Sequence, residues 1–485
     1  MTKSKNICKN LSFNDCELTI LRMAVDEAEK KLGRRVVNSD EVQKIIDIVE
    51  TFIKQKHLIC YGGTAINNIL PEEDRFYDKS VEIPDYDFFS ENALNHAKEL
   101  ADIYYKKGFI NVEAKAGQHY GTYKVFVNYM AVADITYVPK QLYKILKKDA
   151  LSVGGILYAP VNFLRMSMYL ELSRPAGDVG RWEKVLKRLA LLNKNYKVTN
   201  INCSEVNFQR KMDNKIDEYD IFNTLKDVLI NQGVVFFGGY ANSLYSQYMP
   251  KKMKNQIQNA ADFDVLSNEP ETTAEIIKER LDDNGIQNVK IIKHDKLGEI
   301  IPQHYEIRIG KDTVVFIYKP IGCHSYNVLH INGKKVKIAT IDTMLSFYLA
   351  FVYADRSYYN EFSDRILCMS KFLFDVQQKN RLSQKGLLKR FSITCYGHQH
   401  DISEMKEEKA KKYKELKEKD NKKEFDEWFL NYKPDDKKMN KSKTNHKTNK
   451  TNKTNKTKTK IKSKTKKSSN TFINIYGKKS RKKLY

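Results

Sequence analysis

Apolar residues recur along the chain with helical spacing, then with strand spacing, and this alternation occurs twice in similar form. The first occurrence is IVETFIKQKHLICYGGTAINNIL (48–70), and the second is TLKDVLINQGVVFFGGYANSLYS (224–246). Each predicts an amphipathic helix, a short break, an apolar strand, and then Gly-Gly-x-Ala opening another helix. Further on, IPDYDFFS (83–90) matches AADFDVLS (260–267). The pattern therefore predicts strands and helices in the same order in both halves.

The spacing of the two motifs supports a duplication. Gly62 and Gly238 lie 176 positions apart, and Asp85 and Asp262 lie 177 apart. A glycine pair and an Asp-x-Asp do not usually align by chance at one offset. We therefore predict the α/β (α+β) fold class, with two copies of one domain that each contain a mixed sheet and flanking helices.

The carboxylates of the first copy suggest a metal site. Side chains at i and i+2 of a strand share a face, so Asp85 and Asp87 point the same way, about 6.6 Å apart along the strand. YKVFVNYMAVADITYVP (123–139) predicts a further strand that carries Asp134. Three such carboxylates suit two divalent cations, Mg²⁺ or Mn²⁺, beside a triphosphate. In the second copy the position that matches Asp134 is Phe316, which predicts an incomplete site.

The glycine pair suggests where a phosphate would bind. Gly62 and Gly63 end a strand and open a helix, so backbone N–H groups and the helix dipole there suit an anion. Thr64 or Asn67 is a candidate for an additional side-chain donor. A glycine pair alone usually marks a tight turn, and a lone Asp-x-Asp is usually surface charge. Their order along the chain is what favours a site.

Composition adds a basic tail and little else that decides function. The net charge is +25, but after Asp436 there are 18 lysines, one arginine and no acidic residue, which leaves 66 basic and 60 acidic residues, or +6, for the rest. The tail has few apolar residues, which predicts disorder and either a grip on RNA phosphates or a solvated segment. No run approaches the ~18–20 apolar residues of a membrane span, and no apolar secretory leader is seen. The seven scattered cysteines form no CxxC pair, which predicts reduced thiols in an intracellular compartment.

The arrangement of YGGTAINNIL, PDYDFFS and a third aspartate resembles the polymerase-β-like nucleotidyltransferases. The residues of these motifs resemble those of the polyadenylate polymerase catalytic subunits of large DNA viruses, in the poxvirus, asfarvirus and mimivirus grouping. The resemblance covers most of residues 40–195, extends more weakly through the second copy, and excludes the tail. It implies that Gly62 and Gly63 form the glycine motif and that Asp85, Asp87 and Asp134 are catalytic metal ligands.

The helices after the third carboxylate are further candidates. FLRMSMYLELSRPAGDVGRWEKVLKRLALL (163–192) has helical spacing with a break in the middle. The resemblance implies that such helices hold the nucleotide base and the primer, which makes Tyr169 and Ser173 candidates for nucleotide binding and Arg165 and Arg181 for RNA binding. A helical hairpin that simply forms core explains the same letters. The insert PEEDRFYDKSVE (71–82) is expected either to cover the site or to contact substrate.

The function expected from the resemblance is a template-independent poly(A) polymerase that adds AMP from ATP to mRNA 3′ ends. Two alternatives stay open: a CCA-adding or oligonucleotide-synthetase type of nucleotidyltransferase, and a non-enzymatic RNA-binding subunit. The second copy is expected to be catalytically silent. The expected partners are an RNA 3′ end and ATP, with no membrane, and either a homodimer or a separate processivity subunit. The resemblance also implies a virion or host-cytoplasmic location.

These expectations give a domain plan. Its parts are an N-terminal helical segment (1–38), a catalytic nucleotidyltransferase domain with a helical substrate-binding part (39–200), a second, degenerate domain (201–400), a charged helix (401–436) and a disordered Lys-rich tail (437–485).

Overall fold

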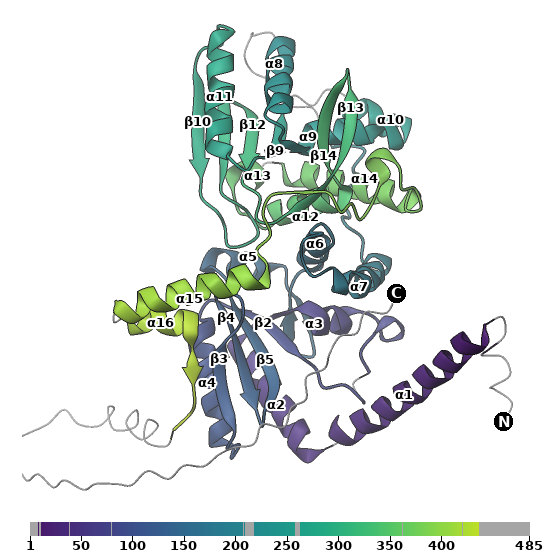
Figure 1. Cartoon of the computed structure of the whole chain (residues 1–485), viewed down its shortest axis with the longest axis vertical. Coiled ribbons are helices and arrows are strands. Elements are labelled where there is room, and N and C mark those ends of the chain that lie inside the picture. The colour runs from purple at the N-terminus through teal and green to yellow at the C-terminus, as the bar shows by residue number, and fades with distance from the viewer. Residues whose placement is uncertain are drawn as a thin grey trace, which may run out of the picture. The chain divides into compact units, whose positions relative to one another are not determined.

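The computed structural model of the 485-residue chain describes residues 8, 11–37, 39–78, 80–206, 208, 218–257, 262–360, 362–419 and 421–435. The described residues up to Pro434 belong to one compact unit (Figure 1). The predicted disorder of residues 437–485 falls outside the described residues. Within the described part, no helix is both long and apolar enough to cross a membrane.

The first copy forms an eight-stranded mixed sheet in the order β16-β3-β4-β5-β2-β1-β7-β6. Its strands are β1 (Ile59–Tyr61), β2 (Tyr86–Ser90), β3 (Val112–Ala116), β4 (Thr122–Val127), β5 (Met130–Tyr137), β6 (Leu151–Val153), β7 (Ile156–Tyr158) and β16 (Asn431–Tyr432). Its helices are α1 (Phe13–Val37), α2 (Asp40–Lys56), α3 (Gly62–Ile69), α4 (Ala93–Lys106), α5 (Lys140–Lys148), α6 (Val161–Leu172) and α7 (Trp182–Asn195). Two pairs, β2 with β5 and β1 with β7, are parallel, and the others are antiparallel.

The second copy forms another eight-stranded mixed sheet, in the order β10-β11-β12-β9-β8-β14-β13-β15. Its strands are β8 (Val235–Phe237), β9 (Phe263–Leu266), β10 (Val289–His294), β11 (His304–Ile309), β12 (Asp312–Tyr318), β13 (His324–Ile331), β14 (Lys334–Ala339) and β15 (Cys395–Tyr396). Its helices are α8 (Glu218–Asn231), α9 (Gly238–Tyr245), α10 (Lys251–Ile257), α11 (Pro270–Asp283), α12 (Ile341–Phe351), α13 (Ser357–Asn360) and α14 (Ser363–Lys379).

The two sheets share one topology, which confirms the predicted fold class. Seven neighbouring strands of the first sheet, in the order β3-β4-β5-β2-β1-β7-β6, correspond one to one to the strands β10-β11-β12-β9-β8-β14-β13 of the second. The parallel pairs also correspond, since β9 is parallel to β12 and β8 is parallel to β14. The same sequence pattern has therefore produced the same strand pairing twice.

Helix α2 shows how the local sequence produces the element in front of the glycine motif. Ser39 caps it by accepting a hydrogen bond from the Val42 amide, and its inward face buries Val42, Ile45 and Val49 at helical spacing. The helix ends where His57 adopts a left-handed backbone conformation with φ of 52°. The chain then reverses directly into β1, which places the following glycines at the end of a buried strand.

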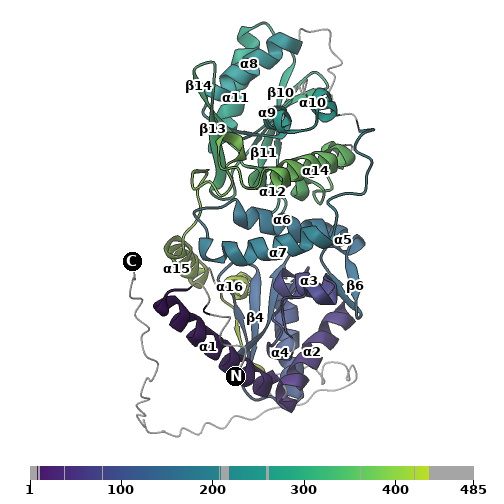
Figure 2. The ribbon, with the colours of Figure 1, turned by 90° about the vertical axis from the view of Figure 1, so that its right-hand side faces the viewer.

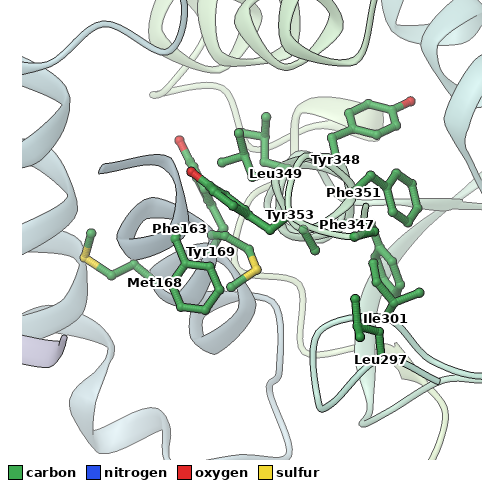
Figure 3. Close-up of a cluster of buried hydrophobic side chains, with 14 of the residues drawn as sticks. Phe163, Met168, Tyr169, Leu297, Ile301, Phe347, Tyr348, Leu349, Phe351 and Tyr353 are labelled. Carbon is green, nitrogen blue, oxygen red and sulfur yellow. The ribbon is translucent and has the colours of Figure 1, made fainter. Parts of the chain in front are cut away.

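The two sheet domains meet through a pair of helices, α6 and α12 (Figure 2). Every residue of α12 is buried, which fits a helix that is apolar on all sides. At the contact, the ring of Phe163 from α6 meets the ring of Tyr353 edge-on at 5.4 Å. Figure 3 shows Phe163 and Tyr169 beside Tyr353 and Leu349 in this cluster. The packing fixes the second domain against the helices that follow the first.

The predicted charged helix of residues 401–436 is wrong as a single element. The structure has two helices, α15 (Ile402–Glu418) and α16 (Lys422–Phe429), and then strand β16. Asn421 ends the continuity because its side chain accepts from the Glu424 amide and starts a new helix. The segment returns to the first sheet, where Lys98 pairs with Asp426 at 2.7 Å and Asn431 pairs with β3 (Figure 1).

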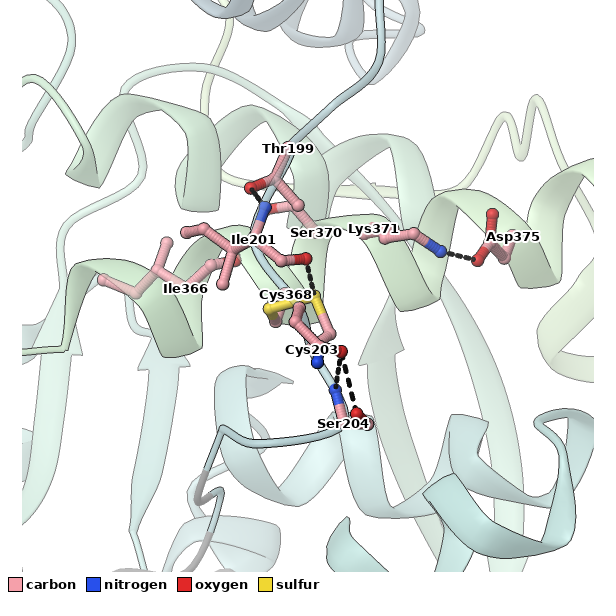
Figure 4. Close-up of a disulfide and its surroundings, with 10 residues drawn as sticks. Thr199, Ile201, Cys203, Ser204, Ile366, Cys368, Ser370, Lys371 and Asp375 are labelled. Atoms are coloured by element: carbon pink, nitrogen blue, oxygen red, sulfur yellow. Dashed lines mark hydrogen bonds and ion pairs between the residues drawn. A yellow bond between two sulfur atoms is a disulfide. The ribbon is translucent and has the colours of Figure 1, made fainter.

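The prediction of reduced thiols is wrong for six of the seven cysteines. The structure pairs Cys8 with Cys16, Cys203 with Cys368, and Cys323 with Cys395, and leaves Cys60 free and buried. Cys203 and Cys368 lie 165 positions apart, a separation from which sequence spacing gives no pairing signal. Figure 4 shows their bond joining the segment that follows α7 to helix α14.

These pairings predict how many thiols react with an alkylating agent. The denatured protein, without reductant, is expected to take up one alkyl group, at Cys60, and seven after reduction. Intact-protein mass spectrometry counts the groups. The Cys60→Ser variant is the control and should take up none before reduction. Seven groups on the unreduced wild type would contradict the pairing.

Candidate active site

The candidate site lies where β1, β2 and β5 meet the start of α3. Asp87 on β2 is directly opposite Asp134 on the parallel strand β5, and opposite Tyr61 on β1. Asp85 precedes β2 by one residue, which places it on the same side of the strand as Asp87. Strand register alone therefore brings the three predicted carboxylates to one end of the sheet.

Gly62 makes room for one of these carboxylates. Its backbone has φ of +75°, which favours glycine, and a Cβ atom there would lie 2.5 Å from Oδ2 of Asp87. The same relation recurs in the second copy, where Gly238 has φ of +77° and faces Asp264. The first glycine of each pair is thus required by the neighbouring aspartate. From the sequence, this glycine was predicted only as part of a phosphate-binding turn.

Gly63 faces a different set of groups. A Cβ atom there would lie 2.6 Å from the hydroxyl oxygen of Tyr77 and 2.9 Å from the guanidinium nitrogens of Arg188. Arg188 donates to the Tyr77 hydroxyl at 2.5 Å, and its guanidinium lies 4.9 Å from the ring centre of Phe76. This places a cationic fork over the start of α3, where the helix dipole already favours an anion.

Burial and neighbouring negative charge raise the proton affinity of Asp85 and Asp87. Burial raises the pKa of Asp87 to about 7, with further contributions from the charges of Asp85 and Asp134. The pKa of Asp85 is also raised, by lost hydration and then by Asp134. Lys124 on β4 is the nearest compensating cation, because its ammonium pairs directly with Oδ2 of Asp134. Such mutual repulsion is expected where a site is arranged to receive a cation.

The donor set fits a divalent cation. Oδ1 of Asp134 is buried and has no hydrogen-bond partner among the described residues. Carboxylate oxygens are the ligands that Mg²⁺ prefers. The three aspartates are nevertheless not the tightest group of candidate ligands in the described chain. That group is His398, His400 and Glu404, whose ligand atoms lie within 4.8 Å of one another.

The histidine group is explained by an ordinary ion pair. Nε2 of His398 lies 3.0 Å from Oε1 of Glu404, and both histidines are exposed. The other carboxylate oxygen of Glu404 accepts from the Asp401 amide in the capping box that starts α15. We therefore assign the candidate active site to the aspartates.

Two predicted phosphate donors have other partners. The Thr64 hydroxyl donates to the backbone oxygen of Asp85 at 2.6 Å, which fixes the start of the Asp-x-Asp strand. The Asn67 side-chain oxygen accepts from the amides of Phe76 and Tyr77, each at 2.8 Å. Both side chains are buried, so they position the motif and the 71–82 insert. Their role as direct nucleotide ligands stays a prediction.

Three residues predicted to bind substrate, on or directly after the following helix α6, are buried. Arg165 is fully buried and donates to Asn193 and to the Tyr196 carbonyl, each at 2.7 Å, and burial lowers its pKa to about 10. Tyr169 and Ser173 are fully buried as well. Helix α6 is therefore the core helix of the hairpin and faces the second domain. The open alternative, that these residues form core, is what the structure shows for them.

The second helix of the hairpin carries the basic residues of the site. Arg181, immediately before α7, and Lys184 and Arg188 within it follow the spacing i, i+3, i+7, which is one helix face. Arg181 is exposed and pairs with Glu171 at 3.2 Å, and its charge offsets part of the rise in the pKa of Asp87. The charge of Lys184 likewise offsets part of the rise in the pKa of Asp85. Lys184, Arg188 and Lys124 were missed from the sequence, although the helical spacing of the first two was visible.

The second copy keeps the frame of the site and changes its chemistry. Phe316 on β12 is directly opposite Asp264 on β9, as Asp134 is opposite Asp87. This confirms the alignment that gave the second copy no third carboxylate. Asp262 instead pairs with Arg365 from α14 at 3.3 Å.

A family model of known proteins matches the part of the chain that contains the first copy. Residues 47–178 match the family model described as poly(A) polymerase catalytic subunit. A protein of Acanthamoeba polyphaga mimivirus named "Putative poly(A) polymerase catalytic subunit" is 32% identical over 162 residues, which is 33% of this chain and 27% of that protein. A protein of the same name from African swine fever virus is 32% identical over 171 residues, or 34% of this chain and 36% of its own length. The aligned part thus spans about a third or less of these relatives.

The fold has a solved counterpart over nearly the whole chain. The crystal structure of the Megavirus polyadenylate synthase superimposes with a TM-score of 0.74 and 20% identity, covering 91% of each chain. At this identity the likeness shows the shared fold, including both mixed sheets. The resemblance stated from the sequence is confirmed for the segment around the glycine and aspartate motifs.

Proposed function

We propose that the chain is a template-independent poly(A) polymerase that transfers AMP from ATP to the 3′-hydroxyl of RNA. The 3′-oxygen forms a bond to the α-phosphorus, the bond from that phosphorus to the α–β bridging oxygen breaks, and pyrophosphate leaves. The observation that carries the proposal is the placement of Gly62, Asp85, Asp87 and Asp134 in one site, within the segment that matches the poly(A) polymerase family.

The aspartates supply the negative charge of the proposed site. Asp85, Asp87 and Asp134 would hold divalent cations, Mg²⁺ or Mn²⁺, which would neutralise the triphosphate and lower the pKa of the 3′-hydroxyl. The buried and unpartnered Oδ1 of Asp134 supports this assignment. Lys124 holds the other oxygen of Asp134 and limits the repulsion among the three side chains.

The face of α7 is the proposed seat of the triphosphate. Arg188 lies over Gly63, and the positive end of α3 faces the same place. Lys184 and Arg181 add charge on the side toward Asp85 and Asp87. The insert supports this seat, since Tyr77 binds Arg188 while its own backbone is held by Asn67.

The wider biology is proposed from the family resemblance. ATP and an RNA 3′ end are the substrates, and a homodimer or a separate processivity subunit would accompany synthesis. A virion or host-cytoplasmic location follows from the same relatives. Residues 437–485, which lie outside the described part, are proposed to contribute a salt-sensitive grip on RNA.

Substrate choice is the most direct test of the proposed function. The full chain, incubated with Mg²⁺ or Mn²⁺, an RNA primer and each nucleoside triphosphate separately, is expected to make long tails with ATP. Gel electrophoresis of a labelled primer measures the products. Short mixed additions would instead indicate a CCA-adding or oligonucleotide-synthetase enzyme, and the proposal fails if no triphosphate extends the primer.

The two copies are expected to respond differently to loss of carboxylates. Asp85→Ala or Asp134→Ala should lower kcat about a thousandfold or more, because several kcal/mol of charge stabilisation are lost. The matched double variant Asp262→Asn with Asp264→Asn should keep kcat on a short primer within about twofold. Thermal unfolding checks that each variant is folded. A loss in the folded double variant comparable to that of Asp85→Ala would show that the second copy is catalytic.

We expect the basic face of α7 to affect the kinetics of ATP use more than the kinetics of primer use. Arg188→Ala should lower kcat/KM for ATP roughly 10- to 100-fold, as expected when a charged hydrogen bond worth about 1.5–3 kcal/mol is lost. Lys187→Ala is the matched control, since Lys187 is on the same helix, is exposed, and pairs only with Glu183 among the contacts described. Steady-state kinetics at varied ATP and fixed primer separate the two. Equal effects of both variants would remove Arg188 from the triphosphate site.

A further inference from the structure

The degenerate site of the second domain encloses a cavity. Its volume is about 80 Å³, which is room for about five to eight water molecules. The glycine pair and both aspartates of the second copy line it, together with aromatic side chains from β12, α12 and α13. The frame that forms a charged cleft in the first domain thus forms a mostly aromatic pocket in the second.

One polar group in this pocket has no structural explanation. Asn242 is 2% exposed, and its amide nitrogen donates to the Tyr348 hydroxyl at 2.5 Å. Its side-chain oxygen is buried and has no hydrogen-bond partner among the described residues. A buried polar atom without a partner destabilises the folded state. Asn242 is the fifth residue of α9, and the fifth residue of α3 is Ile66, so the fold itself does not need an amide here.

The phosphate-binding face is replaced as well. Counted from the helix starts, Lys184 and Arg188 are the third and seventh residues of α7, and Arg365 and Met369 are those of α14. Both Arg365 and Met369 line the cavity. Arg365 pairs with Asp262 at 3.3 Å, and Met369 is uncharged. This face of α14 therefore offers an anionic phosphate less positive charge than the matching face of α7.

The remaining walls suit a flat ring. The rings of Phe316 and Tyr358 are 5.4 Å apart, and those of Phe351 and Tyr359 are stacked at 4.4 Å. All four side chains line the cavity. Aromatic side chains of this kind bind nucleobases by stacking.

We propose that this cavity binds the base of a nucleoside that carries an exocyclic amino group, as adenine does, without a phosphate in the pocket. The amino group would donate to the free oxygen of Asn242 and to the carboxylate of Asp264. Uracil presents two carbonyl oxygens and one N–H. Its carbonyl oxygens would face the oxygens of Asn242 and Asp264, and two acceptors form no hydrogen bond. The site would take a free nucleoside or a base within single-stranded RNA. It goes beyond the proposed polymerase activity and does not rest on it.

Calorimetric titration of the full chain with adenosine in EDTA tests the proposal. Adenosine should bind at least tenfold more tightly than uridine, and saturating ATP should leave the adenosine heat in place. Asn242→Leu should weaken adenosine binding at least tenfold, whereas Arg188→Ala should leave it unchanged. No adenosine binding, or binding that Arg188→Ala removes and Asn242→Leu does not, would overturn the proposal.

A second variant and a second ligand complete the test. Met369→Phe, which fills the cavity from α14, should also abolish adenosine binding, and thermal unfolding identifies whichever variant is folded. If a short oligo(A) loses affinity with Asn242→Leu and oligo(U) does not, the ligand is a base in RNA. If only free adenosine loses affinity, the ligand is a nucleoside, and either result supports the site. AMP addition to a short primer is measured on Asn242→Leu and Met369→Phe and should be unchanged, so failure of this site and failure of the polymerase proposal are distinguishable.

Discussion

The structure depends most on the close approach of Asp87 to the backbone of Gly62. Strand β2 lies between β1 and β5, so an inward side chain at Asp87 reaches both Asp134 on one side and the start of α3 on the other. Any side chain at Gly62 would collide with that carboxylate. The glycine therefore does two things at once: it permits the left-handed turn and leaves the aspartate room beside a helix N-terminus. The cost is lost hydration and mutual repulsion at the carboxylates, and both raise the pKa of Asp87.

Duplication repeats this constraint while freeing the rest of the site. Gly238 and Asp264 keep the same relation as Gly62 and Asp87, although the second copy has no third carboxylate. This persistence indicates that the glycine–aspartate contact belongs to the architecture of the turn. Positions that do not support the turn differ between the copies: Phe316 occupies the register position of Asp134, and Arg365 and Met369 of α14 line an aromatic cavity. Fold and chemistry have thus separated within one chain.

Sequence reasoning succeeded where a motif and its strand register coincide. The aspartates could be placed because period-two alternation fixes which side chains share a face, and the repeat fixed Phe316 by its offset. Sequence reasoning did not identify α6 as a core helix. Helical spacing gives the position of the apolar stripe and does not show that a second domain covers the opposite side. Arg165 then reads as an exposed base, whereas its guanidinium is fully used inside the protein. The prediction for the cysteines failed for a related reason, because only the folded chain brings Cys203 to Cys368.

The domain interface explains why the two helices of the hairpin have different roles. Helix α6 is buried against α12, and its guanidinium group at Arg165 bonds within the protein, to Asn193 and to the Tyr196 carbonyl. Helix α7 packs on α6 and is covered on one side only, which leaves Arg181, Lys184 and Arg188 facing the carboxylates. A helix with one solvated face can carry charge at the site, and a helix between two domains cannot. The second domain therefore occupies α6 and leaves α7 as the helix of the hairpin that faces the aspartates.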